Sequence, residues 1–174
     1  MREFDREGPR ADGAPVVWAG QDDGPALVVV DPAGTAKHEV PPTWHQLAEH
    51  FQVAWCRTPA GENSLEEIED VLETLAERRA PASLVASGEA CPTALAMARQ
   101  FPEIVSSVLL VDPVDDITAD ITAEDTTGTL ADTDIEVRVV ARSHAGPSDR
   151  VEAPMPLGHP EVVEGVAAAL AGLR

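Results

Sequence analysis

Short apolar runs alternate with helical patterns along this chain, and this alternation limits the possible folds more than any other feature of the sequence. The runs are rich in Val and Leu and show little polar alternation, which is typical of strands covered on both faces. Strands that alternate with amphipathic helices predict a mostly parallel sheet of the α/β class. The predicted strands are residues 14–19, 26–30, 51–56, 83–86, 105–111 and 135–140.

Four helices are predicted between and after these strands, at residues 43–51, 64–79, 92–101 and 160–173. Thr43 is the expected N-cap of the first. Ser64 and Glu67 have the spacing of a capping box at the start of the second. The fold class that follows is a three-layer αβα sandwich with a mostly parallel sheet.

Length and charge narrow the class of protein. The 174 residues suit one domain, which we expect over residues 11–174 after an N-terminal extension at 1–10. The net charge of −19 argues against nucleic acid or an anionic membrane as partner. A 44% hydrophobic content excludes a wholly disordered acidic tail. With no apolar stretch of membrane-spanning length and no apolar signal segment, we expect a cytoplasmic protein.

The two cysteines and the acidic segment at residues 112–134 do not indicate a reactive or metal-binding site. Cys56 and Cys91 are the only cysteines and are expected to be buried free thiols. Residues 112–134 hold eight acidic side chains and no Lys or Arg. Their spacing does not match a calcium loop, so we expect an acidic connector in a loop conformation, and neither a metal site nor a cofactor.

The order of these segments resembles the α/β-hydrolase fold from about residue 11 to the C-terminus. Residues 12–20 resemble that family's opening hairpin, and 26–34 its strand and oxyanion loop. Residues 83–90 resemble the nucleophile elbow. The segments at 94–103 and 108–113 resemble the helix and strand that follow it. Gly158-His159 resembles the site of the catalytic histidine.

At the elbow, the resemblance implies a G-x-S-x-G motif with its serine on a strained strand-to-helix turn. The matching pentapeptide is residues 86–90, Ala-Ser-Gly-Glu-Ala, which puts Gly88 at the nucleophile position. Glycine has no oxygen with which to attack a carbonyl. Ser87 lies one residue early, where a strand points its side chain to the opposite face.

The other implied site positions also depart from the family pattern. The acid expected after the strand at 135–140 is replaced by Ser143 or His144, which leaves Asp112 as the alternative acid. His159 is present. The oxyanion loop reads Asp31-Pro32-Ala33, in which Pro32 lacks a backbone donor and Asp31 brings a negative charge. Together with Gly88 and Glu89, these loop residues are the candidate ligand-binding set.

The family's lid is also missing, because the acidic connector at 112–134 stands where lid helices usually occur. We therefore expect a shallow, open site with an acidic rim. The leading hypothesis is an α/β-hydrolase-like protein that has lost hydrolytic activity and acts as a binding, regulatory or scaffold module. One alternative is an active esterase-like serine hydrolase that uses Ser87, His159 and Asp112. Another is an assembly partner, including a homodimer.

Overall fold

The computed structural model describes residues 16–32, 40–57, 64–113, 121–122, 127–130, 133–141 and 155–172. The N-terminal extension, the turn at Asp12-Gly13, Ser143, His144 and Ala33 lie outside these residues. The described strands are β1 (Val16–Gly20), β2 (Ala26–Asp31), β3 (Gln52–Arg57), β4 (Ala82–Ser87), β5 (Val105–Val111), β6 (Ile121–Thr122), β7 (Thr127–Leu130) and β8 (Glu136–Ala141). The described helices are η3 (Pro42–Trp44), α1 (His45–Ala48), α2 (Ser64–Glu77), η4 (Gly88–Ala90), α3 (Cys91–Gln100) and α4 (Pro160–Gly172).

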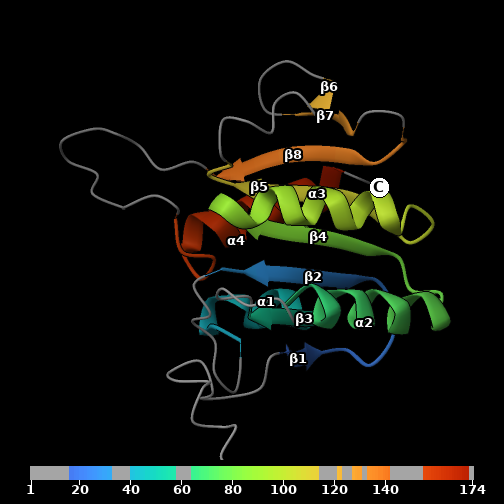
Figure 1. Cartoon of the computed structure of the whole chain (residues 1–174). Coiled ribbons are helices and arrows are strands. Elements are labelled where there is room, and N and C mark those ends of the chain that lie inside the picture. The colour runs from blue at the N-terminus through green and yellow to red at the C-terminus, as the bar shows by residue number, and fades with distance from the viewer. Residues whose placement is uncertain are drawn as a thin grey trace, which may run out of the picture.

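The described strands form one sheet in the order β1-β3-β2-β4-β5-β8-β7-β6. From β3 to β8 neighbouring strands are parallel, whereas β1 runs antiparallel to β3 at one edge. Figure 1 shows β2, β4 and β8 pointing the same way while β1 points the opposite way. The carboxyl ends of the parallel strands therefore all lie at the same end of the sheet. In open α/β folds, ligands bind at this end.

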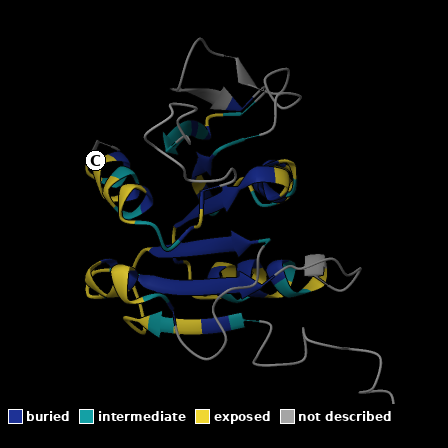
Figure 2. Ribbon diagram, turned by 90° about the vertical axis from the view of Figure 1, so that its left-hand side faces the viewer, coloured by how far each residue is buried: buried dark blue, intermediate teal, exposed yellow. Residues whose placement is uncertain are grey.

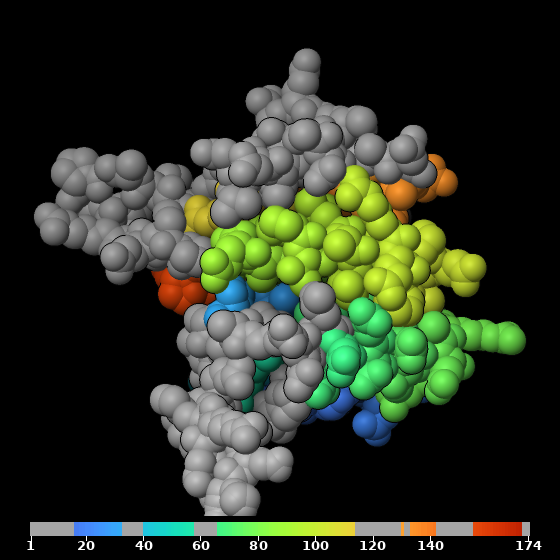
Figure 3. Space-filling view, in the orientation of Figure 1, coloured from blue at the N-terminus to red at the C-terminus, as the bar shows by residue number. Residues whose placement is uncertain are grey.

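Helices cover both faces of the sheet and create two apolar cores. One core lies under α2 and α3 and includes Ile68, Leu72 and Leu95. The other lies under α1 and α4 and includes Trp44, Trp55 and Val162. Figure 2 shows the sheet between these two helical layers, and Figure 3 shows α2 and α3 side by side on one face. The predicted three-layer sandwich with a mostly parallel sheet is confirmed.

Two local predictions are wrong. The connector is not all loop, because β6 and β7 form an antiparallel pair and β7 extends the sheet beyond β8. β-Branched residues at Ile121, Thr122, Thr127 and Thr129 suit strands, although acidic residues dominate the segment between Asp112 and Asp134.

Thr43 is not a helix cap. It lies inside η3, whose N-cap position is Pro41, and its hydroxyl donates to the carbonyl of Gly158 at 2.7 Å. Pro42 begins the short helix one residue earlier than predicted because its fixed φ suits a first helical position. The side chain of Ser64 lies outside the description, so the capping box stays a prediction.

Among the described residues, no helix is both long enough and apolar enough to cross a bilayer.

Candidate functional site

Three predicted site positions lie at the carboxyl ends of neighbouring strands. Asp31 ends β2, Ser87 ends β4 and Asp112 follows β5 directly. Because β4 lies between β2 and β5 in the sheet, these ends are adjacent along one edge. The structure therefore brings these three predicted residues to the same end of the sheet.

The turn after β4 has the shape of an elbow, and a glycine stands at its apex. Ser87 is still extended, with φ −129° and ψ 151°, and only 3% of its surface is exposed. Gly88 then takes φ +53°, in the left-handed region that favours glycine, and η4 begins at this residue. The backbone makes the sharp strand-to-helix turn without presenting a side chain there.

Asp112 uses its carboxylate to hold another segment of the chain. Its Oδ2 accepts a hydrogen bond from the backbone N–H of Met155 at 2.7 Å. Its own N–H donates to the carbonyl of Ala141, the last residue of β8, at 3.0 Å. Its φ of +44° is unusual for a residue with a side chain, although Asp tolerates this region better than most. Asp112 thus connects the end of β5 to the segment that leads into α4.

His159 caps the amino end of α4. Its Nδ1 accepts a hydrogen bond from the backbone N–H of Glu161 at 3.1 Å, and its ring is half-buried. When Nδ1 accepts, the proton of a neutral imidazole is on Nε2. A hydrolase triad needs the reverse tautomer, with Nδ1–H donated to a carboxylate and Nε2 free to take the serine proton. The contact observed is that of a helix cap.

Asp31 is turned into the core. Only 2% of the surface of Asp31 is exposed, and its Oδ2 accepts a hydrogen bond from the indole Nε1–H of Trp55 at 2.9 Å. Trp55 packs edge-to-face on Trp44, with 5.1 Å between ring centroids. The sequence argument missed Trp55, whose signal was a large aromatic near the end of a buried strand. It also missed Arg57, which is 8% exposed and is the register partner of Asp31.

The residues after the elbow differ in exposure. Glu89 is exposed beside Gly88, whereas Cys91 is fully buried. Burial raises the pKa of the Cys91 thiol to about 12, and burial raises the pKa of Cys56 likewise to about 12. Both residues are free cysteines, as predicted. A thiol that stays protonated at neutral pH is a poor nucleophile.

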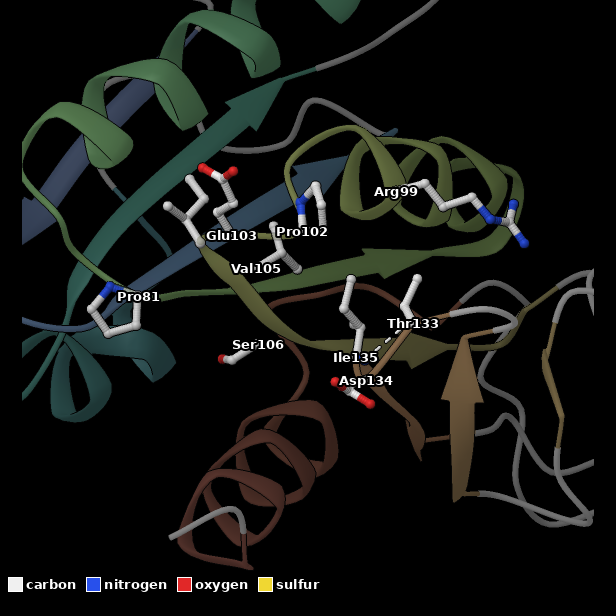
Figure 4. A pocket seen from close by; sticks show the side chains of 10 residues that line it. Pro81, Arg99, Pro102, Glu103, Val105, Ser106, Thr133, Asp134 and Ile135 are labelled. Carbon is white, nitrogen blue, oxygen red and sulfur yellow. Dashed lines mark hydrogen bonds between the residues drawn. The ribbon is translucent and has the colours of Figure 1, made fainter.

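Only two of the eight acidic residues of the connector, Asp112 and Asp134, are among the described residues, and these two lie at opposite ends of the sheet. Asp112 lies at the end of the sheet where the parallel strands terminate. Asp134 lines a groove of about 650 Å³ at the opposite end, where these strands begin, together with Pro81 before β4. Figure 4 shows the charged side chains of Arg99, Glu103 and Asp134 in that groove pointing in different directions. They do not converge on a common ligand atom. Among the described residues, no group of three or more His, Cys, Asp or Glu side chains is placed to hold a metal.

Comparisons with known proteins give weak structural likeness and no sequence match. No family model and no curated protein matches this chain. A solved structure of metagenome-derived lipolytic enzymes, LipS and LipT, matches with TM-score 0.43 and 16% identity over 92% of this chain and 71% of that one.

Two further structures match over more than half of this chain but over less than half of their own length. An N-formylmaleamic acid deformylase from Pseudomonas putida matches with TM-score 0.39 and 21% identity, over 56% of this chain and 42% of that one. A hydrolase from Oleispira antarctica matches with TM-score 0.38 and 14% identity, over 62% and 44%. The chain thus spans less than half the length of these two structures. The class that the described architecture defines is an α/β protein with a mostly parallel sheet between two layers of helices.

Proposed function

We propose that this protein is an α/β-hydrolase-like binding or regulatory module that does not hydrolyse substrates. The observation that carries the proposal is Gly88 at φ +53°, the apex of the turn where a nucleophile would be presented. A hydrolase of this kind needs an oxygen or sulfur at that apex to attack the acyl carbon. The neighbouring hydroxyl, on Ser87, belongs to a residue that is 3% exposed on extended backbone.

The acid and base candidates support the same proposal. Asp112 accepts a hydrogen bond from the backbone N–H of Met155, and His159 accepts one from the backbone N–H of Glu161. Both contacts stabilise the segment that leads into the first turn of α4. Loss of one member of a catalytic triad already costs several powers of ten in rate. A protein with a glycine apex and a capping histidine would bind a ligand at this edge without turning it over.

The ligand class follows from charge. Glu89 is exposed beside the elbow, and the whole chain carries a net charge of −19. A negative field of this size attracts cationic ligands or basic protein surfaces, and added salt weakens such attraction. The candidate contact residues are Pro32, Ala33, Gly88 and Glu89. The fifth residue predicted from the sequence, Asp31, is 2% exposed and its carboxylate accepts a hydrogen bond from the Trp55 indole, so we do not propose that it contacts the ligand.

Hydrolysis of a panel of short- and long-chain aryl esters tests the proposal. The wild type is compared with Ser87→Ala and with His159→Asn, which removes the imidazole but retains a side chain that can cap a helix. We expect the wild type to be indistinguishable from both variants and from the uncatalysed reaction. Turnover by the wild type above the uncatalysed rate would contradict the proposal, and its loss in both variants would favour a hydrolase that uses Ser87 and His159.

A further inference from the structure

We draw no further inference here: the strongest candidate, the pocket of about 240 Å³ lined by Trp18 of β1, Gln52 of β3 and Arg78 after α2, carries nothing because Arg78 already donates to the Gln52 amide and lies over the Trp18 indole, and nothing in the structure shows what would occupy the remaining space.

Discussion

The turn after β4 and the polar side chains around it differ in what they contribute to a site. The turn bends sharply from strand to helix with Gly88 at φ +53°, and this residue has no side chain. Asp31, Asp112 and His159 have groups capable of acid-base chemistry, but their described hydrogen bonds go to an indole or to backbone N–H groups. A sharp strand-to-helix turn therefore does not by itself supply a nucleophile.

The largest expected effect concerns the Asp31 contact. Trp55→Phe removes the indole donor from a buried carboxylate and leaves a small cavity, and we expect a loss of about 2–4 kcal/mol in the free energy of unfolding. Trp44→Phe is the matched control, because the Nε1–H of Trp44 donates to the neutral carbonyl of Leu157 at 2.8 Å. Urea unfolding should show the larger loss for Trp55→Phe. A larger loss for Trp44→Phe would mean that Asp31 does not depend on the indole for its stability.

The next effect concerns Asp112. Asp112→Ala leaves the Met155 N–H without its acceptor, and we expect a loss of about 1–3 kcal/mol in the free energy of unfolding. Asp112→Asn retains a side-chain oxygen and tolerates positive φ, so most of the stability should return. Urea unfolding of both variants measures the difference. Equal loss in the two would show that the charge of Asp112, and not its acceptor oxygen, is what the structure uses.

A smaller effect is expected at His159. His159→Ala removes the cap of α4 and should cost about 1 kcal/mol, whereas His159→Asn should cost little because Asn is a good N-cap residue. Thermal unfolding followed by circular dichroism compares the two. If alanine and asparagine destabilise equally, the side chain does not act as a cap, and a role in binding or catalysis gains support.

The smallest expected signal is the reactivity of the cysteines in the folded state. Because burial raises the pKa of Cys56 and Cys91 to about 12, neither should react with a chromogenic disulfide reagent at pH 8 until urea is added. Their ionisation in the unfolded chain begins near the ordinary pKa of 9.0. The stability that the protonated thiols contribute is therefore complete below pH 9 and is lost as the pH rises towards 12. A thiol that reacts rapidly in the native protein would restore Cys91 as a candidate nucleophile.

Apolar patterning predicted most of the sheet, and the reason is physical. Val105–Val111 is the predicted strand itself, β2 differs from prediction by one residue at one end, and β3, β4 and β8 differ by one residue at each end. Burial on both faces selects the continuous Val and Leu runs that made this possible. The strands β6 and β7 were missed because, at two and four residues, they are too short for their β-branched residues to show an alternating pattern. Their place beside β8 is decided by tertiary pairing.

The sequence predicted that candidate residues lie at the ends of neighbouring strands, but it did not predict their hydrogen-bond partners. Gly88 could be assigned to the apex because residues 86–90 stand in the place of the G-x-S-x-G motif of the family that the sequence resembles. The partners of Asp31 and Asp112 could not be predicted, since they lie 24 and 43 residues away along the chain. Side-chain direction at a strand end depends on packing that no local pattern encodes.

The central claim is that the elbow has no nucleophile, and covalent labelling tests it most directly. The folded protein is incubated with an excess of a fluorophosphonate probe that reacts with activated serines, and its intact mass is measured. We predict an unchanged mass for the wild type. Addition of one probe molecule, mapped by peptide sequencing to Ser87 and abolished in Ser87→Ala, would contradict the account.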